Sequence, residues 1–129
     1  MSFMFEKLEV YQKALNVAEQ IQKLSREFPR GNYYLADQIN RAILSIPANL
    51  AEGNGRWHTN ERRQFFWIAR GSVYECVPLV EMCLRQGLIE PSAAASLKTQ
   101  LEEIAKMICG LINGLEKRHK EIAGQQGKV

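Results

Sequence analysis

The chain has 129 residues, of which 46% are hydrophobic and 24% are charged, and its formal net charge is +3 at pH 7. This length allows one domain with a single core, and no apolar stretch approaches the ~20 residues that a membrane span requires. The mild positive charge permits an anionic partner. It is far lower than the charge of a dedicated nucleic-acid-binding module, which is strongly basic.

Hydrophobic periodicity predicts two helices in the first half of the chain. The first spans about residues 6–27, with one apolar seam and a second seam beside it, and Pro29 with Gly31 ends it. The second spans about residues 32–52 and runs into Gly53-Asn54-Gly55, which we interpret as a C-terminal cap.

Two longer helices follow in the second half. The third begins near Asn60, a plausible N-cap, and runs to about residue 86, where Gly87 stops it. The fourth begins at Pro91, a favoured first-turn position, and continues to about residue 120. Short connections favour antiparallel neighbours. We therefore predict an all-α fold, an antiparallel up-down-up-down four-helix bundle. Residues 1–129 would form one domain, with an ordered core over about 5–120 and a frayed C-terminal tail.

Two prolines, Pro47 and Pro78, fall inside predicted helices. Each removes a backbone donor and clashes with the carbonyl group one turn back. At each proline the helix could either kink and continue or end. We favour kinks, because the apolar periodicity continues through both positions.

The apolar faces of these helices are wider than an isolated bundle needs, since a surface helix requires an apolar stripe only somewhat over ~100° wide. The first helix is apolar over about half its circumference, and Gly110 and Gly114 would let another backbone approach the fourth helix. Contiguous exposed apolar surface usually marks an interface. We therefore expect a homo-oligomer, the alternative being a monomer with an unusually apolar surface.

The residues that commonly carry catalysis or bind metals are scattered. His58 and His119 lack partners at metal-ligand spacing, and no nucleophile motif or phosphate-binding loop is present. Cys76, Cys83 and Cys109 lack CxxC spacing and are typical of reduced thiols in a cytosolic protein. We predict no catalytic site, no metal and no cofactor. With no signal peptide or anchor in the N-terminal sequence MSFMFEKLEV, we expect a soluble cytoplasmic location without membrane contact.

A basic and aromatic surface along the third helix and the loop before it is the better functional candidate. Arginine forks bind phosphates, and aromatic rings stack on bases. The candidate nucleic-acid-binding residues are Arg56, Trp57, Arg62, Arg63, Trp67 and Arg70. The competing interpretation is an amphipathic helix whose Trp67 and Tyr74 pack at a subunit border while arginine stems cover apolar surface.

The second helix carries a polar stripe opposite its apolar seam. A solvated stripe would need no explanation, but a stripe facing another helix would need partners for its charged groups. We favour a structural polar network that sets helix register over a ligand site. Its predicted members are Gln38, Arg41, Ser45, Asn49 and Glu52 on the second helix, with Ser72 and Glu75 on the third.

The residues also carry a family resemblance. The segments Gln38–Ala42, Ser45–Gly53 and Phe65–Ser72, with Arg56 and Glu75, resemble the bacterial four-helix-bundle family encoded by intervening sequences of large-subunit ribosomal RNA genes. The resemblance spans about residues 5–117, and the SIPANLAEG segment is its most specific part. It implies a small helical bundle that assembles into a homopentamer. The chain is also similar to accessory proteins of diversity-generating retroelements, which are basic pentamers that bind nucleic acid, although its own net charge is lower.

Two functional hypotheses follow. The first is a non-catalytic homo-oligomer, a pentamer if the resemblance holds, that binds RNA or DNA without reading its sequence. The alternative is a protein–protein scaffold or adaptor with no nucleic-acid role, using the same apolar and arginine-aromatic surface. An enzyme is the weakest class.

Overall fold

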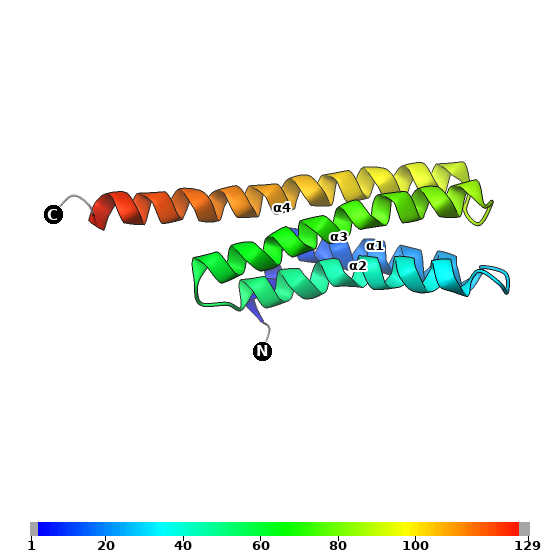
Figure 1. Ribbon diagram of the computed structural model, residues 1–129, viewed down its shortest axis with the longest axis horizontal. Helices are drawn as coiled ribbons and strands as arrows, with labels where there is room; N and C mark the ends of the chain where they lie inside the picture. The colour runs from blue at the N-terminus through cyan, green and yellow to red at the C-terminus, as the bar shows by residue number, and fades with distance from the viewer. Residues whose placement is uncertain (1–2, 127–129) are drawn as a thin grey trace.

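The chain forms a bundle of long helices. The computed structural model describes residues 3–126, with side chains through residue 124. Within that range a short 3-10 turn, η1 (Met4–Lys7), precedes four α-helices, which are α1 (Glu9–Arg26), α2 (Tyr33–Asn54), α3 (Thr59–Arg85) and α4 (Pro91–Gln126). Successive helices run in opposite directions and pack side by side (Figure 1). The predicted all-α four-helix bundle is confirmed.

Three helix ends differ from the sequence-based expectation. The first helix begins at Glu9 rather than near residue 6, because the backbone at Leu8 is extended and separates η1 from α1. Helix α3 begins at Thr59 with His58 as N-cap, so Asn60 lies inside the first turn instead of capping it. Helix α4 continues to Gln126, beyond the expected end near residue 120. Of the tail expected to be frayed, 124–126 are helical and 127–129 lie outside the described residues.

Both internal prolines lie within unbroken helices. Pro47 is buried in α2, whereas Pro78 is exposed on α3. The prediction that neither proline breaks its helix is confirmed, and packing of the continuous apolar faces compensates for the lost backbone hydrogen bonds.

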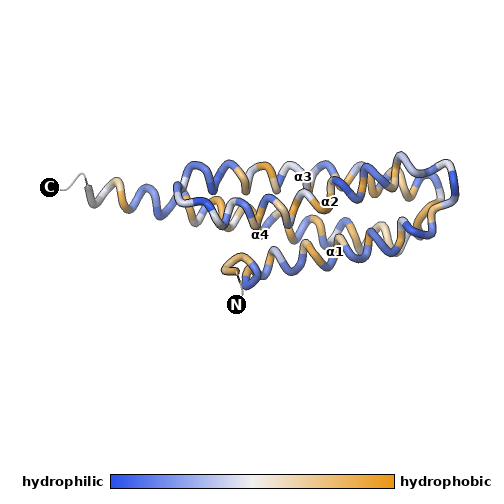
Figure 2. Tube along the Cα trace, turned by 90° about the horizontal axis from the view of Figure 1, so that it is seen from below, coloured by the Kyte–Doolittle hydropathy of each residue, from blue (hydrophilic) through white to orange (hydrophobic). Residues whose placement is uncertain are grey.

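The core runs along the bundle axis and is almost entirely aliphatic. The hydropathy pattern in Figure 2 alternates along each helix, as expected when one face is buried. The largest fully buried side chains come from every helix and include Ile21, Ile43, Ile46, Leu50, Val73, Leu101, Ile104 and Ile108. Full burial of one such aliphatic side chain stabilises the fold by roughly 1.5–3 kcal/mol. The apolar seams read from the sequence therefore form the core.

The contact between α1 and α4 has a polar edge. The Lys13 ammonium lies 2.6 Å from a carboxylate oxygen of Glu103, and the amides of Gln20 and Gln100 are 2.9 Å apart. The hydrogen bond to Glu103 raises the pKa of Lys13 above its usual value. These pairs join residues far apart in sequence and align α1 with α4.

Two glycines explain how the chain turns and packs. Gly87 has φ of +71°, and the amide of Leu88 donates to the carbonyl of Cys83 at 2.9 Å, which closes the C-terminus of α3. Of the predicted cap segment, Gly55 is the C-cap of α2, whereas Gly53 is a residue of the helix itself. A Cβ added there would lie 2.8 Å from a ring atom of Phe66 and 2.9 Å from Cβ of Phe65. Gly53 therefore allows α2 and α3 to approach closely.

None of the helices within residues 3–126 is both long and apolar enough to cross a membrane. In the same range, no group of three or more His, Cys, Asp and Glu side chains is placed to hold a metal ion.

Candidate nucleic-acid interface

The turn between α2 and α3 places one predicted arginine and one predicted tryptophan at the surface. Trp57 is 91% exposed, and its ring is free to stack on an external group. The guanidinium of Arg56 lies 4.7 Å from the centroid of the Phe65 ring and 3.3 Å from a carboxylate oxygen of Glu52. Its side chain remains 45% exposed, so an incoming phosphate can reach it. Arg56 and Trp57 therefore keep the properties expected of binding residues.

Arg62 lies at the junction between α2 and α3. One of its terminal nitrogens donates to the backbone carbonyl of Asn54 at 3.0 Å, at the last residue of α2. Its Nε is buried and has no hydrogen-bond partner among the described residues. A cation bound to the free carbonyls at a helix C-terminus also interacts favourably with the helix dipole. Arg62 therefore closes the α2–α3 junction, and with its buried Nε it is less available to a phosphate than Arg56.

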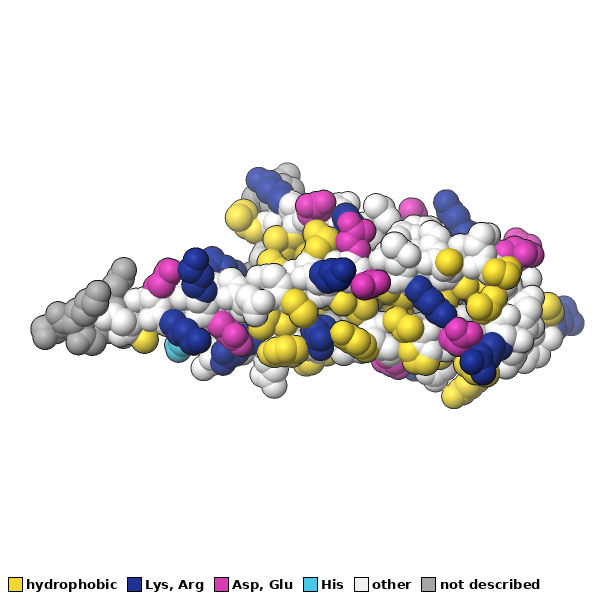
Figure 3. All heavy atoms as spheres, turned by 90° about the horizontal axis from the view of Figure 1, so that it is seen from above, with side chains coloured by type: hydrophobic (Ala, Val, Ile, Leu, Met, Phe, Trp, Pro, Cys, Tyr) yellow, Lys and Arg dark blue, Asp and Glu magenta, His cyan; other side chains and the backbone are white. Residues whose placement is uncertain are grey.

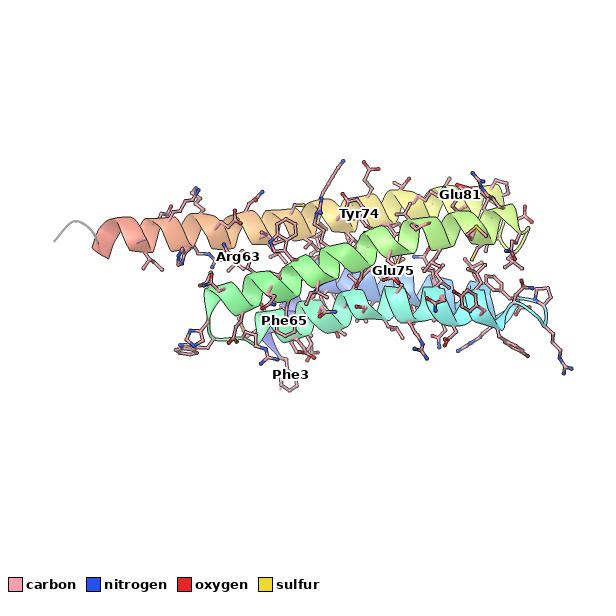
Figure 4. The ribbon with its side chains drawn as sticks, viewed as in Figure 1. Phe3, Arg63, Phe65, Tyr74, Glu75 and Glu81 are labelled. Atoms are coloured by element: carbon pink, nitrogen blue, oxygen red, sulfur yellow. The ribbon has the colours of Figure 1, made fainter. Side chains whose placement is uncertain are left out.

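Two charged residues of α3, Arg63 and Glu81, lie along its boundary with α4 (Figure 4). Arg63 lies 3.7 Å from a carboxylate oxygen of Glu116, and it also binds the Asn60 side chain at 2.8 Å. One turn before the end of α3, Glu81 accepts a 2.6 Å hydrogen bond from Lys98. Hydrogen bonds from Lys98 and Arg85 lower the pKa of Glu81. Its stabilising effect is therefore present above the ordinary carboxyl pKa and is lost as the pH falls.

Arg70 is the most constrained of the predicted arginines. Its Nε donates to Sγ of Cys109 on α4 at 3.1 Å, and a terminal nitrogen donates to the Tyr74 hydroxyl at 3.0 Å. The guanidinium also stacks 4.6 Å from the Tyr74 ring centroid and 5.4 Å from that of Trp67. The hydrogen bond to Cys109 holds the pKa of Arg70 above its usual value. Arg70 thus links α3 to α4 and orients two aromatic rings.

The outward face of α3 is apolar over four turns. We call this surface the outer row; its residues are spaced four, three, four and four apart, and all are exposed: Trp67, Gly71, Tyr74, Pro78 and Met82. Trp67 is 49%, Tyr74 55% and Met82 43% exposed. Figure 3 shows hydrophobic side chains running along the face of the molecule that is seen from above. Trp67 therefore belongs to an exposed apolar row, of which the Arg70 guanidinium covers part.

Only part of the predicted polar network forms. Asn49 donates to Oγ of Ser45 at 3.0 Å, the hydroxyls of Ser45 and Ser72 are 2.8 Å apart, and Ser72 bonds the Ile68 carbonyl at 3.2 Å. These side chains form a continuous chain of hydrogen bonds across the α2–α3 contact. For these three members, the predicted register role agrees with the geometry.

The other four members of that prediction, Gln38, Arg41, Glu52 and Glu75, do not join this chain of hydrogen bonds. Arg41 pairs with Asp37 at 3.1 Å and Glu52 with Arg56, both within or beside the same helix and both exposed. Glu75 is exposed, and Gln38 is half-buried. Arg41 and Glu52 therefore need no partner on α3, because each is exposed and pairs with a residue four positions away in the sequence.

Removing one hydroxyl from the serine pair should cost more than its size suggests. Ser72→Ala leaves the Ser45 hydroxyl half-buried without its acceptor, so we expect a loss of about 1–2 kcal/mol in the free energy of unfolding. Ser45→Ala should have a similar effect, because Asn49 loses a partner. The double variant Ser45→Ala/Ser72→Ala should lose less than the sum. Urea unfolding of all four proteins measures this coupling, and strictly additive losses would contradict it.

Sequence reasoning missed two features of this region. The contact of Cys109 with Arg70 has no local sequence signal, because the residues are 39 positions apart. The run Lys117-Arg118-His119-Lys120 near the end of α4 was readable as a basic segment and was not singled out. All of these four residues are exposed.

The described residues offer no catalytic grouping. An open groove between α1 and α2 has a volume of about 480 Å³ and is lined by Leu15, Leu44 and small or amide side chains with Glu19 and Arg26. Cys76 and Cys83 are buried in the core, and burial raises the pKa of Cys76 to about 12. A thiol with that pKa stays protonated at neutral pH and is a poor nucleophile.

Comparison with known proteins places this geometry in a family. The family model described as 23S rRNA-intervening sequence protein matches residues 6–110. Among solved structures, the fold is similar to that of a protein of unknown function from the S23 ribosomal protein family of Bacteroides thetaiotaomicron, with a TM-score of 0.74 and 24% identity. The alignment covers 80% of this chain and 97% of that one. No curated protein matches the chain. Because the family model covers most of the sequence, the chain belongs to the 23S rRNA-intervening sequence protein family.

Proposed function

We propose that this protein is a non-catalytic helical bundle that associates with copies of itself and binds RNA or DNA without reading the sequence. The outer row of α3 would form the subunit contact. The exposed turn between α2 and α3 would contact nucleic acid. The location consistent with this role is the cytoplasm.

The single observation that carries the proposal is the separation of two kinds of surface on α3. The outer row is apolar and exposed, as is typical of interfaces, whereas Arg63 and Arg70 beside it are held by contacts with α4. A second copy of the chain is the occupant we propose for this row. The pentamer implied by the family resemblance is one closed arrangement that would cover it.

The nucleic-acid part of the proposal rests on the turn. Trp57 is almost fully exposed, and the partly exposed Arg56 and Arg63 are close to it along the chain. Stacking of a base on an aromatic ring is worth about 1–3 kcal/mol and tolerates any base. Phosphate contacts from arginine add affinity without sequence information. Together these groups support sequence-independent binding.

Titration of labelled single-stranded RNA and duplex DNA at several salt concentrations tests this part. We expect the double variant Arg56→Ala/Arg63→Ala to reduce the slope of log K against log salt by about 0.7–0.9 units for each lost contact. Trp57→Ala should lower affinity at every salt concentration, because stacking carries no charge. Arg62 is left unchanged, since its replacement would disturb the α2–α3 junction. Tyr33→Ala, on an exposed aromatic residue at the start of α2, is the matched control for Trp57→Ala.

A wild-type protein that binds neither nucleic acid at about 50 mM salt would contradict the nucleic-acid role. The scaffold function would then be favoured, because Arg70 is held by Cys109 and Tyr74 and leaves the outer row free for a protein contact. A pull-down that returns one nuclease-resistant protein would support that alternative.

A further inference from the structure

The C-terminal part of α4 extends beyond the rest of the bundle. Among the described side chains, Leu115 is the last buried one of α4, and the next residue, Glu116, forms an ion pair with Arg63 of α3. Residues 117–124 are all exposed. At 1.5 Å per residue, the helix from residue 117 to residue 126 is about 15 Å long. Figure 1 shows this end of α4 running past the turn between α2 and α3. We call residues 117–126 the α4 arm.

The charge of the α4 arm is predominantly positive. Lys117, Arg118 and Lys120 are cationic and Glu121 is the one acidic residue of the arm, within a chain whose formal net charge is only +3. Figure 3 shows Lys and Arg side chains clustered on this projecting end. Lys117 and Lys120 have no ion-pair partner among the described residues, in contrast to Arg63 and Lys98 within the bundle. Basic groups that pair with nothing in the chain are available to an external anion.

The arm holds these charges on the same side of the bundle as the turn between α2 and α3. The arm begins where Arg63 meets Glu116, so it leaves the bundle beside the turn that carries Arg56 and Trp57. Phosphates of one B-DNA strand are spaced about 3.4 Å apart along the axis, and the arm is therefore long enough to face about four of them. The matched family segment ends at residue 110, so the arm lies outside it.

We propose that the α4 arm is a phosphate-contacting arm, in which Lys117, Arg118 and Lys120 hold the backbone of the same nucleic acid that the α2–α3 turn binds. This inference rests on the proposed nucleic-acid function and adds three exposed cations to the proposed contact. An apolar docking role fits the arm less well, because Ile122 is its only large apolar side chain among the described ones. The arm would act by counterion release, without reading bases.

The test uses two triple variants of the full chain that lose the same charge at opposite ends of the bundle. The arm variant is Lys117→Ala/Arg118→Ala/Lys120→Ala. The matched control is Lys23→Ala/Arg26→Ala/Arg30→Ala, three exposed cations at the α1–α2 end. Binding of labelled RNA and duplex DNA is measured from about 50 to 200 mM salt. Thermal unfolding and solution mass are measured for both variants.

We expect the arm variant to lower the salt slope by about 2 units or more and to reduce affinity at least about tenfold, while the control stays close to wild type. The thermal unfolding of the arm variant should be unchanged, because the described side chains of the arm, residues 117–124, are all exposed. Equal losses in both variants would indicate general charge attraction and overturn the inference. So would a drop in solution mass confined to the arm variant, which would make the arm a subunit contact.

The failure of the two proposals can be told apart. If wild type binds and the arm variant binds equally well with the same slope, only the arm assignment fails. If the wild-type protein binds no nucleic acid, the proposed function is contradicted, and so is the assignment of the arm, which rests on it.

Discussion

Replacing Gly53 by alanine is expected to destabilise the protein, although alanine is the better helix former. The added methyl group would lie 2.8 Å from the ring of Phe66, which is only 4% exposed, and 2.9 Å from Cβ of Phe65. Neither atom can move away without shifting α3, because one is fixed in the core and the other is attached to the backbone. Such overpacking costs about 1–3 kcal/mol, partly offset by up to about 1 kcal/mol of helix propensity. We expect a net loss of about 1–2 kcal/mol, measured by urea unfolding.

The same substitution at Gly110 provides the control. Gly110 is inside α4, and a Cβ added there would meet nothing within 4 Å. Gly110→Ala should therefore raise the free energy of unfolding by about 0.5–1 kcal/mol. The two substitutions are chemically identical and both are in helices, so opposite signs isolate the close approach of α2 and α3. A stabilising effect of Gly53→Ala would show that this approach is not required.

Charge placed on the outer row of α3 is expected to dissociate the proposed assembly. In the double variant Trp67→Glu/Met82→Glu, each interface would have to bury carboxylates without partners, which costs several kcal/mol. Solution mass should fall from that of an oligomer to that of the 14.7 kDa chain. Light scattering coupled to size-exclusion chromatography measures this change. Helix content should stay the same, because both side chains are exposed in the single chain.

The control for this experiment carries the same charge on other exposed aromatic residues. Tyr33→Glu/Tyr34→Glu alters side chains that are 71% and 77% exposed at the start of α2, away from the outer row. It should leave the mass of the assembly unchanged. A monomeric wild-type protein would contradict self-association altogether, and an oligomer unaffected by the outer-row substitutions would place the subunit contact elsewhere.

The candidate site was less predictable than the fold. The sequence spacing places five residues on one helical face, and the structure has all of them in α3: Arg63, Trp67, Arg70, Tyr74 and Glu81. Spacing alone does not say which edge of the face meets a neighbouring helix. In the structure the charged edge meets α4 and is paired, while the aromatic edge faces outward. Arg62 could not be assigned either, because its partner is the backbone carbonyl of Asn54 at the end of another helix.

The sequence by itself determined the class of fold, the number of long helices, the composition of the core and the family. These depend on apolar periodicity and turn residues, which act locally and are readable along the chain. Only the tertiary structure decided that Gly53 allows α2 and α3 to pack closely. It also decided that three members of the predicted polar network form a chain of hydrogen bonds across α2 and α3. The continuation of α4 past the bundle as a basic arm was likewise visible only there. Those features depend on distances between helices and on where one helix ends relative to another, and no local pattern encodes either.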